Sequence, residues 1–303
     1  ALDTCTTGAE NVAVGQAALY DNTTASYNTA VGRFAMRYNT TANDNTAVGY
    51  YAMAATTTGN ANTAVGTYAL DKNTTGVYNT AIGWGALTEC VTVNNCTAVG
   101  YKALEDNTAA NNTAFGSETL KDNTSGNDNT GIGYEALKDN TTGSDLTALG
   151  DNALANNTTA SSNTAVGSES LLTNTTGSYN TAVGHQSLYL NSTGAQNTAV
   201  GFEALKDNTT THSCTAVGYK SAENATANYT TAVGDRSMAG ATVTGEHNTA
   251  LGHYTLYTLT SGARNTGAGS NALAAITTGD DNTSLGYAAL SANTTASDNT
   301  AVG

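Results

Sequence analysis

The amino-acid sequence predicts an all-β protein, a β-solenoid (β-roll) of about 18 coils with a 17-residue repeat. The pentapeptide Asn-Thr-Ala-Val-Gly of residues 28–32 recurs in near copies, and fourteen of the seventeen intervals between its glycines, from Gly15 to Gly303, are 17 residues long. The 303 residues contain no proline, which cannot donate the backbone hydrogen bond that a strand ladder needs. Seventeen residues are too few for a pair of helices but are enough for one turn of a solenoid.

The columns of the repeat predict the local structure of one coil. We number the coil from its first asparagine, so that residues 28–44 occupy columns one to seventeen of the consensus Asn-Thr-Ala-Val-Gly-x-x-Ala-Leu-x-x-Asn-Thr-Thr-Gly-x-x. Columns two to four place β-branched residues around a small one, which favours a short strand. The invariant glycine of column five indicates a corner or a close backbone approach. Columns twelve to fifteen are typical of a turn, and we expect two or three short strands per coil.

The apolar columns predict a narrow hydrophobic core. Columns four and nine are expected to point inward, with the alanines of columns three and eight enclosed beside them. The predicted core spine consists of Val31, Met36, Val48, Val65, Leu70, Ile82 and Leu87. The asparagines of columns one and twelve are expected to form hydrogen-bonded ladders between coils. The variable columns carry most of the charged and aromatic residues and are expected to face solvent.

Composition limits the domain organisation and the classes of partner. The repeat continues without a shift in composition, so we expect a single continuous solenoid array over residues 1–303, with no separate domains. Lys and Arg number 10 against 24 Asp and Glu, which gives a net charge of −14. Nucleic acid is therefore not an expected partner, because binding to phosphates needs a basic stripe. No apolar run of 18 residues is present, so no membrane span is expected.

The pentapeptide and the Ala-Leu that follows it resemble a known repeat. Residues 79–83 (Asn-Thr-Ala-Ile-Gly) and 180–184 (Asn-Thr-Ala-Val-Gly) are similar to the head repeats of YadA-like trimeric autotransporter adhesins and to the shaft repeats of some phage tail-fibre proteins. The resemblance covers the whole chain and implies a β-roll that is displayed on a cell or virion surface and used for attachment. The coil here is longer than the usual unit of that family by an Asn-Thr-Thr-Gly turn, which leaves trimeric assembly open.

These observations lead us to expect a non-enzymatic, structural, extracellular fibre or filament segment with an adhesin-like role. Self-association is expected, either as a trimer or end to end, because the chain begins at column eight and stops at column five. Aromatic residues at column six, such as Tyr50, Trp84 and Tyr101, predict a ridge that binds surface glycans or matrix, or that is covered by neighbouring chains.

Two alternatives within the same fold class also fit the repeat. One is a phage tail-fibre shaft. The other is an ice-binding, threonine-rich solenoid, for which pairs such as Thr23 and Thr24 would supply the rows. A polysaccharide-degrading β-helix enzyme is not expected, because the acidic residues are scattered at one or two per coil instead of being clustered.

The cysteines supply one candidate cross-link. Cys90 at column twelve and Cys96 at column one of the next coil both replace asparagine, so they form a disulfide if those two columns face each other. Such a bond would support an oxidising, extracellular setting. Cys5 and Cys214 replace asparagine singly and have no such partner.

Asparagine sequons recur at column twelve and predict either glycosylation or merely a need for a turn-forming residue. The glycosylation candidates are Asn22, Asn39, Asn73, Asn123, Asn140, Asn157, Asn174, Asn191, Asn208 and Asn293. No catalytic, cofactor or metal site is expected. The four histidines share no ligand spacing, and the Gly-x-Gly patterns at 131–133 and 267–269 are variants of the repeat with no helix pattern after them.

Overall fold

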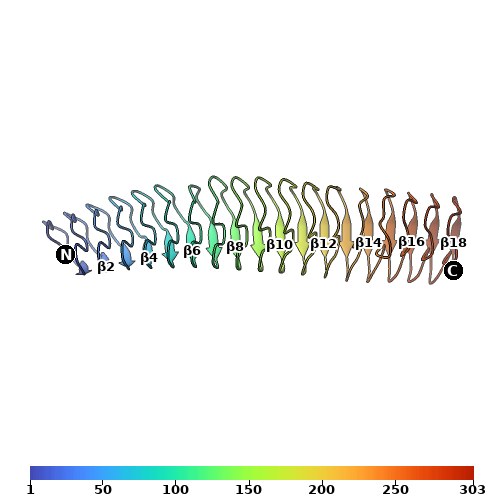
Figure 1. The fold of residues 1–303 in the computed structure, drawn as a ribbon, viewed down its shortest axis with the longest axis horizontal. Helices are drawn as coiled ribbons and strands as arrows, with labels where there is room; N and C mark the ends of the chain where they lie inside the picture. Colours follow the sequence, from blue (N-terminus) through green and yellow to red (C-terminus); the bar gives the residue numbers. More distant parts are fainter. The chain divides into compact units, whose positions relative to one another are not determined.

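The structure, a computed structural model, describes all residues from 1 to 303, and it divides into two compact units, Ala1–Asp151 and Asn152–Gly303. Each unit is a parallel β-solenoid without helices, in which every coil contributes one short strand (Figure 1). The predicted fold class, an all-β solenoid with a 17-residue repeat, is therefore confirmed. No helix that could cross a membrane is present.

The strands are three residues long and number eighteen in all. The first unit contains β1 (Val12–Val14), β2 (Thr29–Val31), β3 (Thr46–Val48), β4 (Thr63–Val65), β5 (Thr80–Ile82), β6 (Thr97–Val99), β7 (Thr113–Phe115), β8 (Thr130–Ile132) and β9 (Thr147–Leu149). The second unit contains β10 (Thr164–Val166), β11 (Thr181–Val183), β12 (Thr198–Val200), β13 (Thr215–Val217), β14 (Thr231–Val233), β15 (Thr249–Leu251), β16 (Thr266–Ala268), β17 (Thr283–Leu285) and β18 (Thr300–Val302).

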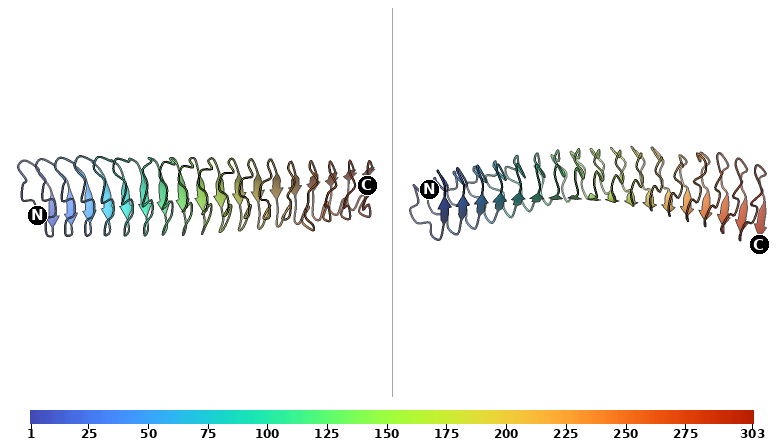
Figure 2. Two further views of the ribbon diagram at one scale, coloured as in Figure 1. Left: turned by 45° about the horizontal axis from the view of Figure 1, so that its top comes forward. Right: turned by 60° about the horizontal axis from the view of Figure 1, so that its bottom comes forward.

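Within each unit, the strand of one coil pairs in parallel with the strand of the next, and equivalent columns lie opposite each other. Ala30 of β2 lies opposite Ala47 of β3, and Ala182 of β11 lies opposite Ala199 of β12. The strands of a unit lie side by side along one side of its coils, and the turns return on the other side (Figure 2). Successive rungs are thus about 4.8 Å apart, the spacing of neighbouring strands.

The expectation of two or three strands per coil is wrong, because backbone conformation breaks the extended chain after column four. Columns seven, nine and seventeen have positive φ, as at Phe34 (63°), Met36 (47°) and Asp44 (60°), and such residues turn the chain sharply. These residues still bond to adjacent coils: Met36 N–H donates to the Ala52 carbonyl at 3.0 Å. The corner at Gly32 has φ 136°, and a Cβ there would lie 2.3 Å from the Gly49 carbonyl oxygen, so only glycine fits.

The core is narrower than the sequence suggested. The column-nine members of the predicted spine, Met36, Leu70 and Leu87, are fully buried as predicted, and so are the alanines of columns three and eight, such as Ala30 and Ala35.

The column-four members of the spine point outward, so their predicted burial is wrong. Val48 and Val65 are 36% exposed, Ile82 is 40% exposed, and Val31 is partly exposed. Side chains alternate across a strand. Since the column-three alanine takes the inward position, columns two and four must both face away from the interior.

Asparagine side chains complete the interior and replace missing backbone partners. Asn28 at column one is buried; its Oδ1 accepts the backbone N–H of Asn45 in the next coil at 3.0 Å, and its Nδ2 donates to the Ala42 carbonyl at 2.9 Å. At column twelve, Nδ2 of Asn140 donates to Oδ1 of Asn123 at 2.8 Å. The predicted asparagine ladders are therefore confirmed, and they satisfy polar groups that would be costly to bury alone.

Candidate functional site

The strand face of each unit is the first candidate surface, and we define it as the side chains of columns two and four. Column two is threonine in every coil but the first, and column four is Val, Ile, Leu, Phe or Ala. The column-four side chains of β7 and β9, Phe115 and Leu149, are 56% and 44% exposed. No charged residue occurs at either column, although charged residues make up 11% of the chain.

The threonine hydroxyls of the strand face have no partner within the chain, in contrast to other threonine rows. No column-two hydroxyl donates a hydrogen bond, whereas at column thirteen Thr23 Oγ1 donates to the Thr40 carbonyl at 3.1 Å and Thr40 Oγ1 to the Thr57 carbonyl at 3.2 Å. The Thr23 and Thr24 pair, predicted from the sequence as two ice-binding rows, therefore offers only one free row, at exposed column fourteen. The row of threonines whose hydroxyls are free and which lies in register on paired strands is column two.

A second candidate surface is an aromatic cluster in the first unit, at columns six and seven of successive coils. Ring centroids are 4.9 Å apart for Phe34 and Tyr51, 5.6 Å for Tyr50 and Tyr68, and 6.3 Å for Tyr68 and Trp84. We call Phe34, Tyr50, Tyr51, Tyr68 and Trp84 the aromatic platform. The sequence indicated only its column-six members. The column-seven rings were missed, although their 17-residue spacing was visible, because positive φ at that column brings them beside column six.

Two arginines stack on one end of the platform. The guanidinium carbon of Arg33 lies 4.5 Å from the Phe34 ring centroid, and that of Arg37 lies 5.0 Å from the same centroid. Arg37 also lies 4.9 Å from the ring centroid of Tyr38. Neither arginine forms an ion pair, and Nε of Arg37 is buried without a hydrogen-bond partner. Their positive charges are held by ring faces instead of carboxylates.

The second unit has a smaller stack of the same kind. The rings of His185, Phe202 and Tyr219 stack in sequence at 5.4 and 5.3 Å. Arg236 lies 5.2 Å from the Tyr219 ring centroid and donates from Nη1 to Oη of Tyr254 at 3.1 Å.

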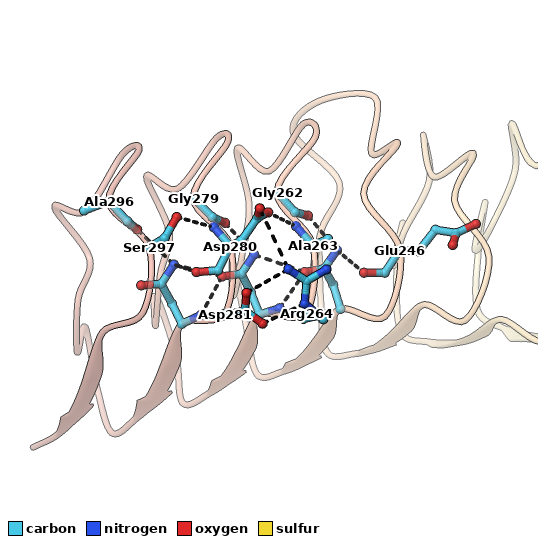
Figure 3. A network of polar contacts seen from close by, with 12 residues as sticks. Glu246, Gly262, Ala263, Arg264, Gly279, Asp280, Asp281, Ala296 and Ser297 are labelled. Carbon is cyan, nitrogen blue, oxygen red and sulfur yellow. Dashed lines mark hydrogen bonds and ion pairs between the residues drawn. The ribbon is translucent and has the colours of Figure 1, made fainter.

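Many charged residues elsewhere bind one another or the neighbouring backbone. Figure 3 shows such a network at columns sixteen and seventeen: Nε and Nη2 of Arg264 donate to the two carboxylate oxygens of Asp281, each at 2.7 Å, and Oδ1 of Asp280 accepts the Ala263 N–H at 2.8 Å. The Asp280 N–H in turn donates to Oγ of Ser297 at 3.0 Å. This network ties one coil to the next. No group of three or more His, Cys, Asp or Glu side chains is placed to hold a metal ion.

The predicted disulfide between Cys90 and Cys96 is not formed, since all four cysteines are free thiols. Cys96 takes the place of a column-one asparagine: its Sγ donates to the Ala109 carbonyl at 3.4 Å and accepts from Nδ2 of Asn107 at 3.5 Å. Burial raises the pKa of Cys90 to about 12 and also raises the pKa of Cys96. Buried thiols of this kind are poor nucleophiles.

The glycosylation candidates are, with one exception, inside the coil. Nine of them have no exposed surface, and these are Asn22, Asn39, Asn73, Asn123, Asn140, Asn157, Asn174, Asn191 and Asn208. A glycan would replace a hydrogen on Nδ2, but in Asn73 this atom donates to the Gly76 carbonyl at 3.1 Å within the turn. The folded structure therefore contradicts these nine predictions. Asn293 is partly exposed, and its glycosylation stays a prediction.

Comparisons of the chain with protein-family models, with curated proteins and with solved structures return no match.

Proposed function

We propose that this protein is a structural, non-enzymatic solenoid whose strand face packs against further copies of the chain, building an extracellular fibre that serves surface attachment. The observation that carries the proposal is the strand face itself, which presents an uncharged surface with an apolar residue in column four of every coil. Large, continuous exposed apolar surfaces are uncommon on soluble monomers and typically mark interaction sites.

A second copy is the occupant that fits this face best. Val48 and Ile82 are 36% and 40% exposed. Because burying a fully exposed side chain of this kind contributes roughly 1.5–3 kcal/mol, covering the exposed remainder contributes roughly 0.5–1 kcal/mol per rung. A partner that buries every rung must repeat at the rung spacing, and another copy does so. The lack of charge on the face also keeps the repulsion between chains of net charge −14 away from the contact.

The resemblance of the pentapeptide to adhesin heads and tail-fibre shafts supports a cell or virion surface as the location and attachment as the role. A phage tail-fibre shaft is one form of the same proposal. The free thiols remove the argument for an oxidising compartment that a disulfide would have supplied. End-to-end stacking stays a prediction.

Sedimentation velocity at micromolar concentration tests the self-association. The wild-type chain is expected to form oligomers, and the triple variant Val48→Lys, Val65→Lys, Ile82→Lys is expected to be a folded monomer, because the lysines lie at exposed positions of the strand face. The matched control adds three lysines to the same coils at exposed column fourteen, as Thr58→Lys, Thr75→Lys and Thr92→Lys, and is expected to associate like the wild type. A monomeric wild-type chain would refute the proposal.

Ice binding is a second candidate, favoured by the unpartnered hydroxyls of column two. A flat, in-register row of hydroxyls beside a row of methyl groups can order water at the surface of a crystal, and no other threonine row on a strand has free hydroxyls. Thermal hysteresis of the wild-type chain, lost in the strand-face lysine variant and kept in the column-fourteen control, would support this function. A wild-type chain that is monomeric and shows no thermal hysteresis would refute both proposed functions.

A further inference from the structure

The cations of this chain fall into two groups, and the smaller group marks a surface that the proposed function does not use. Seven of the ten Lys and Arg residues lie within 4.0 Å of a carboxylate: Lys72, Lys102, Lys121, Lys138, Lys206, Lys220 and Arg264. The other three, Arg33, Arg37 and Arg236, form no ion pair, and all three lie over aromatic rings. In a chain with 24 acidic residues, a cation without a carboxylate is the exception.

Two of these arginines sit together at the aromatic platform. Arg33 is exposed and reaches over both Phe34 and Tyr50, at 4.5 and 6.0 Å from the ring centroids. The guanidinium carbon of Arg37 lies 5.0 Å from the Phe34 ring centroid and 4.9 Å from that of Tyr38, and its buried Nε–H has no acceptor. A buried guanidinium N–H without a partner is costly, so a movement of the Arg37 side chain that lets an oxygen reach this N–H is favourable.

The rings of the platform extend the surface along the solenoid, beyond the two arginines that supply its charge. Tyr50, Tyr68 and Trp84 come from three successive coils, and Tyr50 and Trp84 are 38% and 45% exposed. The rungs advance by about 4.8 Å each, a step comparable with that of one sugar ring in an extended polysaccharide. The Tyr68 ring meets those of Tyr50 and Trp84 at interplanar angles of 78° and 86°, so the exposed faces of Tyr50 and Trp84, two rungs apart, match the apolar faces of alternate pyranose rings.

We infer that the aromatic platform with Arg33 and Arg37 binds an acidic polysaccharide whose sugars carry carboxylates, a polyuronate. The flat sugar faces pack on the rings, and a carboxylate accepts the fork of guanidinium N–H groups, a bidentate geometry that arginine is suited to. A uronate carries one charge per sugar. This density fits two free arginines in an acidic chain better than a densely sulfated polymer, which the net charge of −14 repels more strongly.

Calorimetric titration of the full chain with short oligomers of polygalacturonate at low salt tests the inference. Saturable binding is expected. The variant Arg33→Gln, Arg37→Gln is expected to weaken binding at least roughly tenfold, since hydrogen bonds to a charged group contribute about a factor of ten or more in affinity. The ring variant Tyr50→Ala, Trp84→Ala is expected to weaken it as well. Both pairs are at the surface, and unchanged circular dichroism verifies the fold.

Matched controls separate the platform from general effects of charge and aromatic content. Tyr134→Ala removes a 53%-exposed tyrosine that lies outside the platform, and Arg264→Gln removes an ion-paired arginine. Neither is expected to change the affinity. The strand-face lysine variant is also expected to bind, so the inference and the proposed self-association can fail separately.

Three results would overturn the inference. The first is no binding of polygalacturonate oligomers at millimolar concentration. The second is equal binding of a neutral glucan oligomer of the same length, which would remove the role of the arginines. The third is preferential binding of dextran sulfate, which would show that the surface selects charge density instead of a uronate.

Discussion

The interior of the solenoid allows a sharp test of packing, because two coils carry a matched pair of departures from the consensus. Column three is glycine at Gly131 and Gly267 only, and in each case column eight of the preceding coil is threonine, Thr119 or Thr255, where most coils have alanine or serine. A Cβ built on Gly131 would lie 2.7 Å from Cγ2 of Thr119, and the same distance recurs between Gly267 and Thr255. The threonine methyl group thus occupies the space that an alanine Cβ uses in other coils.

The change Gly131→Ala therefore overpacks the core in the wild-type chain. The carbon–carbon contact would be about 1 Å shorter than the optimum of roughly 3.5–4.0 Å. Rotating Thr119 away would break the hydrogen bond from its Oγ1 to the Gly133 carbonyl, which costs about 1 kcal/mol. Overpacking costs typically 1–3 kcal/mol, and the loss of glycine's freedom in the unfolded chain offsets about 0.4–1 kcal/mol. We expect a net destabilisation of about 1–2 kcal/mol.

The double variant Thr119→Ala, Gly131→Ala restores the consensus coil and should remove the clash. The double variant is expected to be more stable, by about 1–3 kcal/mol, than the value obtained by adding the two single effects to the free energy of unfolding of the wild type. A coupling of this size is typical of residues in contact. Urea denaturation followed by circular dichroism measures the midpoints, and amide hydrogen exchange at β8 and β9 localises the effect, since unfolding of a repeat array need not be two-state. The pair Thr255 and Gly267 serves as a replicate. If Gly131→Ala had the same effect with and without Thr119→Ala, the packing argument would be wrong.

Three further predictions follow from buried polar groups. Desolvation raises the pKa of Asp71 to about 6, above its unfolded value of about 3.9. The folded state thus loses stability as pH rises from about 4 to 6, and Asp71→Asn should raise the urea midpoint at pH 7.5, by up to about 2 kcal/mol in stability, but not at pH 4. Asn62→Ala should cost about 2–4 kcal/mol, because Oδ1 accepts the Asn79 N–H at 2.9 Å and Nδ2 donates to the Gly76 carbonyl at 2.8 Å; an unchanged thermal midpoint would contradict the ladder. Native thiol titration should detect only Cys5, which is partly exposed, and denaturation should release all four thiols; two thiols missing after denaturation would instead indicate the disulfide.

Much of the fold could be predicted from the sequence because the repeat fixes which residues are equivalent. The period gives the parallel register, and the invariant glycine gives the corner that Gly32 makes. The direction in which column four points could not be derived from hydrophobicity, since Val48 is apolar and yet faces outward. The small size of Ala47 beside it was the better indicator of which side faces inward, because a strand that packs closely against the opposite side of the coil accepts only small inward-pointing side chains.

The candidate surfaces were harder to predict than the core because they depend on side-chain direction instead of residue type. The sequence showed an aromatic ridge at column six, but the column-seven rings join it only because Phe34 and Tyr51 have positive φ, at 63° and 55°. Non-glycine residues with positive φ are uncommon, so no propensity argument would have assigned that conformation to Phe or Tyr.

The inward-pointing residues and the surface residues of this solenoid are therefore under different physical constraints. Inward columns must fit a neighbour about 4.8 Å away, so a change such as Gly131 requires Thr119 in the preceding coil. Outward variable columns meet no such restriction, and side chains at columns six and seven can change coil by coil without cost to the core. A run of rings and unpaired arginines that extends over consecutive coils, as from Arg33 to Trp84, is consequently not required by folding. Its exposed rings and unpaired arginines are the groups through which we infer that an acidic polysaccharide binds.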